Sequence, residues 1–311
     1  MLKEKVLKIL AENRGECLSG QSIAAACGVS RNAVWKAVNA LQKEGVGIVA
    51  LKNKGYALSD NALLESDVTL PENTRFFLYN SVDSTNNEAK RLLAKGIKEN
   101  AVIIANEQTA GRGRLGRDFY SPKDTGLYFS YLFHPNKSLS DTVFITTAAA
   151  VSVVRAIEKI STLKPEIKWV NDVYLGGRKI CGILTEAISD FESGVAQSVI
   201  VGIGINVNTA DFPKSIEKTA ASLNDKSITR PKIAQALADE IIKVADNLSA
   251  PDILEDYRAH SLVLGKEITY IKNGEKYTAI ADSIGDKGEL IVKTPTGDRQ
   301  TLSSGEISVR L

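Results

Sequence analysis

The chain has 311 residues, with 39 lysines and arginines against 37 aspartates and glutamates, so its net charge neither indicates nor excludes a nucleic-acid partner. Three widely spaced cysteines and two histidines argue against a disulfide framework and against a structural zinc site, and they fit a reducing cytoplasm. The length predicts two or three domains, and since no apolar run approaches the length of a bilayer, we expect no membrane partner.

The N-terminal part of the sequence predicts a winged helix-turn-helix. The apolar residues of 2–12 share one helical face, and Ser19 and Ser30 are placed to cap two further helices, which gives a helix-turn-helix at about 18–43. Residues 47–58 predict two strands around a turn, which would be the wing. Plain packing of helices is the alternative. The basic, polar and aromatic side chains expected to contact DNA are Arg31, Asn32, Trp35, Lys36, Lys52 and Lys54.

The remaining sequence predicts an α+β fold in two parts. Strand-like and helical patterns follow each other with several hairpins over residues 63–264, which favours a central mixed β-sheet covered by helices on one face. Long helices are expected at about 142–160 and 233–248. Short strands separated by glycine turns over 265–311 predict a small β-barrel. With the DNA-binding domain at 1–62, we therefore expect three domains.

A loop rich in glycine and arginine, residues 111–117, follows a strand that we expect to be buried. Glycine allows backbone amides to approach a ligand closely, and arginine binds phosphate or carboxylate with two hydrogen bonds. Gln108, directly before the loop, could donate and accept toward the same ligand. The loop thus predicts an anionic nucleotide or acyl phosphate as ligand, whereas a solvated basic turn is the alternative.

Other segments could contribute to the same site. Ser84, Thr85 and Asn86 lie between a strand and a helix, where they could bind a polar group or only cap the helix. Residues 168–172 end a strand with an amide and an acid, a pair suited to a ribose or a metal-bound phosphate, or simply to a turn. Lys179 precedes an apolar run and needs an anionic partner if it points inward, but it could extend into solvent instead.

Two suggestive patterns are rejected. Residues 202–206, Gly-Ile-Gly-Ile-Asn, look like part of a dinucleotide fingerprint, but no helical pattern follows them. Cys181 lies in an apolar run without a neighbouring histidine, which favours an inert buried thiol over a nucleophile. The sequence also contains no GxxxxGK[ST] loop, so a nucleotide must bind on another scaffold.

Five motifs in this order resemble those of biotin protein ligases. They are Ser84-Thr85-Asn86, Glu107–Arg114, Lys168–Asp172, Arg178–Glu186 and Gly202–Asn206. With the winged helix-turn-helix ahead of them, the chain is similar to the bifunctional type, which also represses the biotin operon. The resemblance implies a biotin/lipoate ligase-like central domain, an SH3-like C-terminal barrel, and formation of biotinyl-5′-adenylate from biotin and ATP with Mg²⁺.

The same resemblance implies partners and a role for individual residues. Biotin would pass to a lysine of a biotin carboxyl carrier protein, and the adenylate-bound chain would form a homodimer on operator DNA. The implied biotin-binding residues are Ser84, Thr85, Asn86, Gln108, Arg112, Gly113, Arg114 and Lys179. The implied ATP-binding residues are Gly111, Arg112, Arg114, Trp169, Asn171, Asp172, Asn206 and Arg310.

Lys179, Arg112 and Arg114 are the implied catalytic residues, because a carboxylate and a phosphate must meet and their repulsion has to be neutralised. Mg²⁺ would lie near Asp172. Val170 stands where the family usually has proline. Two alternatives remain open at this point: a repressor whose central domain only senses a ligand, and a lipoate-type protein ligase.

Overall fold

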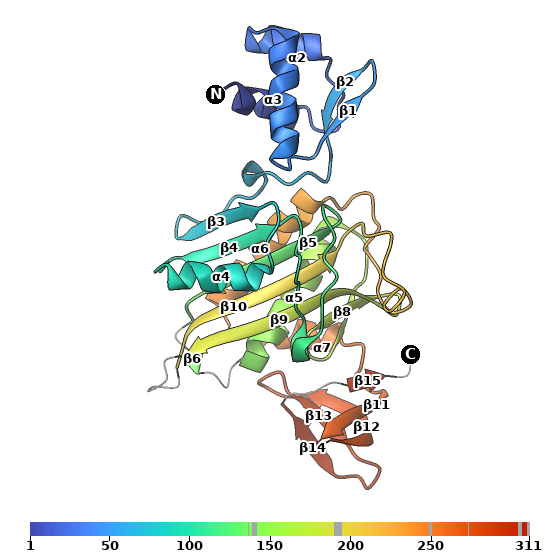
Figure 1. The fold of residues 1–311 in the computed structure, drawn as a ribbon. Helices are drawn as coiled ribbons and strands as arrows, with labels where there is room; N and C mark the ends of the chain where they lie inside the picture. Colours follow the sequence, from blue (N-terminus) through green and yellow to red (C-terminus); the bar gives the residue numbers. More distant parts are fainter. Residues whose placement is uncertain are drawn as a thin grey trace.

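The computed structural model shows an N-terminal head, a central sheet with helices and a small C-terminal sheet, following each other in chain order (Figure 1). Within the described residues no helix is long and apolar enough to cross a membrane. The ranges that the structure describes are 1–135, 137–138, 142–189, 195–248, 251–272, 274–303 and 307–309.

The head is a winged helix-turn-helix, as the sequence predicts. Its elements are α1 (Leu2–Glu12), α2 (Gly20–Cys27), α3 (Arg31–Lys43), β1 (Ile48–Leu51) and β2 (Gly55–Leu58). The hydroxyls of Ser19 and Ser30 accept hydrogen bonds from the amides of Ser22 and Ala33, at 3.0 and 3.2 Å, and so cap α2 and α3. Gly28 has a φ of 67° after α2, a conformation that glycine adopts without strain.

The central domain is built on a mixed eight-stranded sheet in which β3 and β4 pair in parallel and the other ladders are antiparallel. The strand order is β3-β4-β5-β10-β9-β8-β7, with β6 paired to β10. The strands are β3 (Thr74–Tyr79), β4 (Asn100–Ala105), β5 (Gly126–Phe133), β6 (Lys137–Ser138), β7 (Glu166–Lys168), β8 (Asp172–Leu175), β9 (Arg178–Ser189) and β10 (Val195–Asn206).

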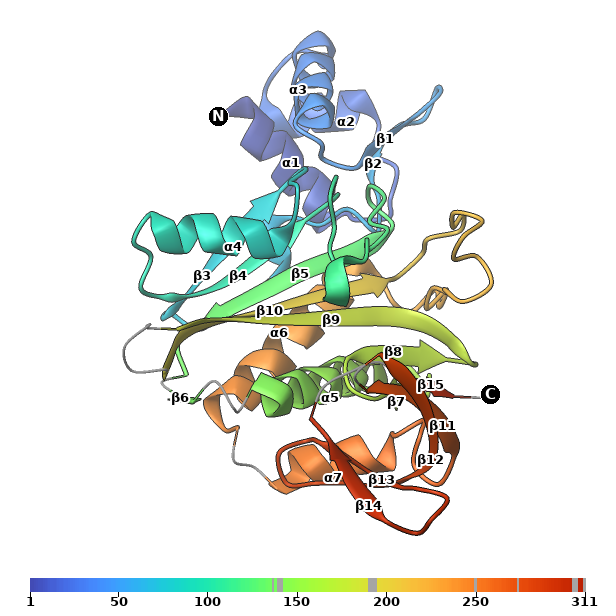
Figure 2. The ribbon, with the colours of Figure 1, turned by 60° about the horizontal axis from the view of Figure 1, so that its bottom comes forward.

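Helices cover both faces of this sheet, so the expectation that they lie on one face is wrong (Figure 2). Ala101 and Ile103 of β4 pack against α4, whereas Val102 and Ile104 point to the opposite face and join the core formed with the other helices. The physical reason is that β4 is apolar at every position after Asn100, which suits a strand buried on both sides. The helices are α4 (Thr85–Ala94), α5 (Thr142–Ile160), α6 (Arg230–Asp246) and α7 (Pro251–Ala259).

Helix α4 covers only part of its face of the sheet. It contacts β4, β5 and β10, and leaves the strands at the other end of that face, β9 and β8, without a covering helix (Figure 2). The short 3₁₀ turns η1 (Glu65–Asp67) and η2 (Arg114–Gly116) lie outside the sheet. This part of the face, formed by β8 and β9, is called the bare half of the sheet below, and a ligand can reach the strands there.

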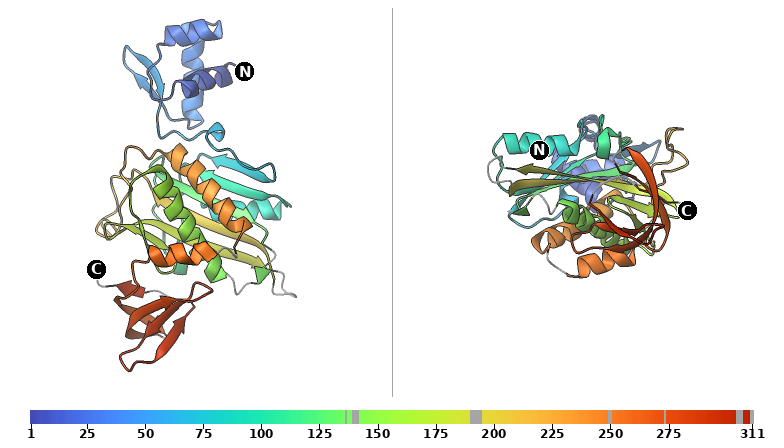
Figure 3. Two further views of the ribbon diagram at one scale, coloured as in Figure 1. Left: turned by 180° about the vertical axis from the view of Figure 1, so that it is seen from behind. Right: turned by 90° about the horizontal axis from the view of Figure 1, so that it is seen from below.

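The C-terminal domain is an antiparallel sheet of five strands, as expected for a small β domain (Figure 3). Its order, β14-β13-β12-β11-β15, is an open path through the described residues. The indole N–H of Trp169 donates to the carbonyl of Gly288 at 2.9 Å and attaches this sheet to the central domain. The strands are β11 (Glu267–Lys272), β12 (Glu275–Ile284), β13 (Leu290–Lys293), β14 (Arg299–Leu302) and β15 (Ile307–Val309).

The segment between the head and the central sheet is packed into both. Ala62 and Leu64 are buried in the core of the head, while Leu63 and Val68 are buried in the core of the central domain. Apolar side chains of this segment thus alternate between the two cores. The head is therefore held on the central domain by buried contacts.

Candidate active site

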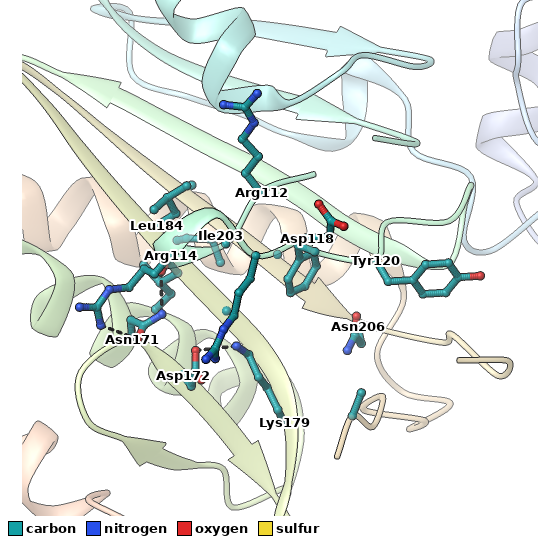
Figure 4. A pocket seen from close by; sticks show the side chains of 18 of the residues that line it. Arg112, Arg114, Asp118, Tyr120, Asn171, Asp172, Lys179, Leu184, Ile203 and Asn206 are labelled. Atoms are coloured by element: carbon teal, nitrogen blue, oxygen red, sulfur yellow. Dashed lines mark hydrogen bonds and ion pairs between the residues drawn. The ribbon is translucent and has the colours of Figure 1, made fainter. Parts of the chain in front are cut away.

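A cavity of about 430 Å³ lies over the bare half of the sheet. It brings together most of the residues that the sequence selected from five separate segments (Figure 4). The predicted residues on its wall are Ser84, Thr85, Asn86, Gln108, Arg112, Gly113, Arg114, Trp169, Asn171, Asp172, Lys179 and Asn206. Gly111 is buried beside the wall, where a Cβ would come within 2.6 Å of both the Phe119 carbonyl and the Ser121 hydroxyl.

One end of the cavity is a network of neutral hydrogen-bonding groups. Gln108 Oε1 accepts from the amide of Thr85 at 2.9 Å and from its hydroxyl at 3.1 Å, and Gln108 Nε2 donates to Ser121 Oγ at 2.9 Å. Ser130 Oγ lies 2.7 Å from Thr85 Oγ1 and 2.6 Å from Asn86 Oδ1. Each of these groups both donates and accepts, so the network can bind a neutral polar ring.

Ser84 is the N-cap residue of α4 but makes no capping hydrogen bond with its side chain. The amide of Thr85 in the first turn is satisfied by Gln108 instead. Simple capping, the alternative for this motif, therefore does not account for the Ser84 side chain, and Ser84 lines the cavity.

Asn86 is fixed by a charged group behind it. Its Nδ2 donates to Glu186 Oε2 at 2.9 Å and to the carbonyl of Leu184 at 3.3 Å. Glu186 is in turn paired with Lys90 of α4 at 2.7 Å. The orientation of the Asn86 amide, which leaves Oδ1 for Ser130, thus depends on this ion pair.

The floor of the cavity is made of glycines on two adjacent strands. Gly204 of β10 lies opposite Gly182 of β9, and the ring of Phe119 lies on both, because an added Cβ would be 2.4 Å from that ring at Gly204 and 3.3 Å at Gly182. At Gly202 an added Cβ would be 2.3 Å from Asn86 Oδ1. The floor therefore has no room for side chains, and a flat group can lie directly on the backbone.

The other end of the cavity is charged. The ammonium of Lys179 lies 2.7 Å from Asp172 Oδ1, and the guanidinium of Arg114 donates to Asn171 Oδ1 at 3.0 Å. Asn171 is held by a bond of 3.0 Å from its Nδ2 to the carbonyl of Ile183. Lys179 thus has the anionic partner that an inward-pointing lysine requires.

The loop of residues 111–117 is partly engaged with this charged end. Its backbone is closed by hydrogen bonds from the amide of Gly113 to the carbonyl of Arg117 and from the amide of Phe119 to the carbonyl of Gly111, at 2.7 and 2.9 Å. The Arg112 side chain is exposed and points away from Lys179 and Asp172, whereas Arg114 reaches Asn171 (Figure 4). Of the two arginines predicted to be catalytic, Arg114 therefore contacts the charged end of the cavity and Arg112 does not.

Relatives among known proteins match nearly the whole chain. Family models match residues 3–57 (HTH domain), 78–206 (Biotin/lipoate A/B protein ligase family) and 263–310 (Biotin protein ligase C terminal domain). The bifunctional ligase/repressor BirA of Bacillus subtilis is 37% identical over 97% of each chain, and BirA of Escherichia coli is 26% identical over 98% of this chain and 96% of the other.

The chain belongs to the bifunctional biotin ligase/repressor family. A solved structure of the family's ligase part, the biotin protein ligase of Aquifex aeolicus in complex with biotin and ATP, is 30% identical to the chain with a TM-score of 0.64. It covers 76% of this chain and 98% of its own length.

Two residues that the family resemblance assigned to ATP are engaged in internal contacts. The Trp169 side chain lines the cavity but gives its N–H to Gly288. The buried Asn206 donates from Nδ2 to the carbonyl of Ala221 at 3.0 Å and so holds the segment that follows β10. Arg310 lies outside the described residues.

The residues predicted from the sequence to contact DNA are on the surface of the head. All six predicted side chains, on α3 and at the turn between β1 and β2, are exposed, and Trp35 is 51% exposed although it is a large aromatic. The opposite face of α3 is buried through Val34, Val38 and Leu41. The head thus presents a basic and aromatic helix face together with a basic wing tip.

In the described residues no group of three or more histidines, cysteines, aspartates and glutamates could hold a metal. Mg²⁺ in nucleotide sites needs only one or two carboxylates besides the phosphates and water, and Asp172 at the cavity wall meets that need.

Cys181 is fully buried, and burial raises the pKa of its thiol well above the usual value, so it stays protonated. Burial likewise raises the pKa of Tyr174 to about 12.

Sequence reasoning missed residues that support the site from behind. Ser130 had a usable signal, since it is a single polar residue within the otherwise apolar strand β5. Phe119 had none, because an aromatic after a loop occurs in many settings, and Glu186 entered only as the last residue of the Arg178–Glu186 motif, with no role assigned. Their roles depend on which strands become neighbours, and a single sequence does not contain that information.

Proposed function

We propose that the chain is an ATP-dependent biotin protein ligase that also represses biotin genes, with the adenylate as corepressor. The observation that supports this best is one cavity with two different ends, joined by a floor of glycines. A neutral hydrogen-bonding network occupies one end, and Lys179 with Arg114 and Asp172 occupies the other. An amphipathic acid with a polar ring and a carboxylate matches both ends at once.

The neutral end would bind the ring system of biotin. Thr85, Asn86 and Gln108, with the Ser84 hydroxyl, offer donors and acceptors to a cyclic urea. The glycine floor would take the flat face of the ring, after Phe119 moves from it. The biotin chain would then direct its carboxylate toward Lys179.

The charged end would carry the first reaction. An oxygen of the biotin carboxylate attacks the α-phosphorus of ATP, the bond from that phosphorus to the bridging oxygen breaks, and pyrophosphate leaves. Lys179, Arg112 and Arg114, with the amide of Gly113, would neutralise the two anions as they meet. In the second reaction the amine of a carrier-protein lysine attacks the acyl carbon, loses a proton and releases AMP.

ATP would occupy the part of the cavity beyond Lys179. The assigned residues in described positions are Gly111, Arg112, Arg114, Trp169, Asn171, Asp172 and Asn206, and Arg310 is assigned by resemblance only. Asp172 would hold Mg²⁺, which supplies positive charge to the phosphates. Since Val170 is buried and its carbonyl accepts from the hydroxyl of Tyr257 at 3.4 Å, a packed backbone precedes Asn171 without proline.

A direct comparison of biotin and lipoate tests the ligase assignment. The purified full chain is given Mg²⁺-ATP with biotin, with lipoate or with neither, and pyrophosphate release is measured, followed by transfer to a biotin carboxyl carrier domain. We expect release and transfer with biotin only. Activity with lipoate alone would identify a lipoate-type ligase, and no release with either acid would leave a ligand-sensing repressor.

The loop of residues 111–117 would close over the adenylate and slow its escape. Leu115 in this loop is exposed, so the tip of the loop projects into solvent. Limited proteolysis with and without biotin plus ATP tests this, and we expect slower cleavage in the loop when both are present. Equal rates would contradict loop closure.

Repression would follow from a ligand-dependent homodimer in the cytoplasm. A two-fold dimer places two copies of α3 on a palindromic operator, and we propose domain limits of 1–62, 63–264 and 265–311 for the parts involved. Sedimentation and gel-shift assays on the promoter DNA of the biotin genes, with and without biotin plus ATP, test the coupling. Ligand-independent dimers and DNA binding would contradict it.

A further inference from the structure

Arg230, at the start of α6, is buried completely, which is unusual for a charged side chain. Its guanidinium donates to the carbonyl of Gly126 at 2.8 Å, to Asn106 Oδ1 at 2.7 Å, and to Asp124 Oδ1 and the carbonyl of Asn61 at 3.2 Å each. Its backbone amide also donates to Asn61 Oδ1 at 3.2 Å. One side chain thus joins the segment below the head to the central sheet.

The charge of Arg230 is only weakly compensated by an opposite charge. Burying a guanidinium is costly unless it is well paired, and the only carboxylate within 4.0 Å in the described residues is Asp124, which is 43% exposed. The hydrogen bonds of Arg230 are therefore better explained by what they hold together.

Two of the Arg230 partners are the ends of the ligand-binding segment. Asn106 directly follows β4 and Asp124 precedes β5, and between them lie Gln108 and the loop of residues 111–117. The amide of Asp124 donates to the carbonyl of Asn106 at 3.0 Å and closes the base of this segment. Arg230 donates hydrogen bonds to both residues, Asn106 and Asp124, at that base.

Asn106 is also connected by hydrogen bonds to α3, the helix of the head that we expect to contact DNA. Its Nδ2 donates to Asn80 Oδ1 at 3.3 Å, and Asn80 Nδ2 donates to the carbonyl of Glu44 at 2.6 Å. Glu44 is the C-cap residue of α3, where carbonyls lack partners within the helix. At Gly45 a Cβ would be 1.9 Å from Asn80 Oδ1, so Asn80 is seated tightly against the end of the helix.

We propose that Arg230, Asn106 and Asn80 are positioning residues that couple the ligand-binding segment to the DNA-binding head. A ligand that orders residues 107–123 also fixes Asn106 and Asp124 at the ends of this segment. Asn106 is connected through Asn80 to the end of α3. Both are connected through Arg230 to Asn61, in the segment between the head and the central sheet. The inference rests on the proposed function, because it takes biotin and ATP as the ordering ligands. It adds a route within one protomer, whereas dimerisation acts between two.

Hydrogen–deuterium exchange on the full chain tests the coupling, with ATP alone compared with biotin plus ATP. The amides of Glu44, Gly45 and Val46 are hydrogen-bonded to α3 carbonyls, so their protection is measurable. In the wild type we expect protection of residues 109–121 and a change of about fivefold or more in the exchange of 44–46. In Asn80→Ala the loop stays protected while the change at 44–46 is lost.

The control is Asn247→Ala, at an exposed position after α6, which should behave like the wild type. Arg230→Lys keeps the positive charge but loses the several N–H donors of the guanidinium, and it should weaken both the protection of the loop and the change at 44–46. If this variant does not fold, Asn80→Ala alone decides. Loop protection with no change at 44–46 in the wild type overturns the coupling, as does an unchanged response in Asn80→Ala. Absence of loop protection in the wild type overturns the proposed function as well.

Discussion

Lys179 lies next to Asp172 at an irregularity in the pairing of strands β8 and β9. The β8–β9 ladder shifts register between Val173 and Tyr174, and such shifts redirect side chains near active sites. The backbone of Lys179 is also bonded on its other side, its amide to the carbonyl of Thr219 at 2.8 Å and its carbonyl to the amide of Ala221 at 2.8 Å. The ammonium is thus placed by a rigid strand and not by a flexible loop.

Replacing Lys179 by alanine tests its place at the reacting groups. We expect Lys179→Ala to lower the rate of adenylate formation by about 10²–10³, because one fixed positive charge is lost where two anions meet. Pyrophosphate release measures this, and the variant should remain folded by circular dichroism. Lys98→Ala, at an exposed lysine outside the cavity, is the control, and near-normal turnover of Lys179→Ala would refute the role.

The start of α4 is an element whose stability should depend on pH. The hydrogen bonds from Arg91 to Asp83 hold the pKa of that carboxyl well below its usual range. Because the folded pKa is depressed, the stabilisation is present above the unfolded pKa of about 4 and is lost as the pH falls below it. Asp83 also accepts from Asn87 and from the amide of Ser84, so it braces the residues next to the cavity.

Asp83→Asn should therefore destabilise the chain at neutral pH and less in acid. Both partners are partly exposed, so we expect a loss of about 0.5–1 kcal/mol in the free energy of unfolding near pH 7. Urea unfolding between about pH 6 and pH 2 should show the gap to the wild type closing as the pH falls. A gap that is independent of pH would mean that the carboxylate charge is not what matters.

The wing is a second element with a measurable electrostatic role. Lys52 and Lys54 are exposed at the turn between β1 and β2, where lysines would contact phosphates. Replacing both by alanine should reduce the slope of log affinity against log salt by about two on a mixed-sequence duplex. A matched double replacement of Lys276 and Lys293 in the C-terminal sheet changes the charge equally and should leave the slope unaltered.

The sequence predicted where helices and strands lie better than it predicted which of them pack against each other. Caps at Ser19 and Ser30 and the apolar runs located helices and strands, because these signals are local. The second face of the sheet, covered by α4, could not be foreseen, since it depends on which strands pair. Likewise Arg230 carries no local signal: its burial results from the meeting of a linker, a loop base and a helix start that lie far apart in the chain.

At the scale of the whole molecule, the C-terminal sheet completes the cavity by docking on the central domain. Ile307 and Ser308 line the cavity, and the sheet is attached by Trp169 and by Arg258, whose guanidinium donates to the carbonyl of Ile284 at 2.9 and 3.2 Å. The position of β15 therefore depends on this docking, which the apolar core shared by the two domains also supports.

Weakening this docking should raise the KM for ATP. Trp169→Phe keeps a ring but removes one hydrogen bond, worth about 1 kcal/mol, and we expect KM to rise about fivefold with faster proteolysis between the two domains. Arg258→Ala, outside the cavity, should act in the same direction. Trp35→Phe in the head is the control, and a KM that changes in Trp169→Phe but not in Arg258→Ala would mean direct contact with the nucleotide.

The parallel register of β3 and β4 has a consequence for how the protein tolerates changes in length. Tyr79 is paired with Ala105, so the next residues, Asn80 and Asn106, emerge side by side. One inserted residue in either strand would turn its asparagine to the opposite side of the sheet, whereas an insertion in the exposed turn at 95–99 would leave the pair untouched. Variation in length should therefore accumulate in that turn, while the strands on either side keep their number of residues.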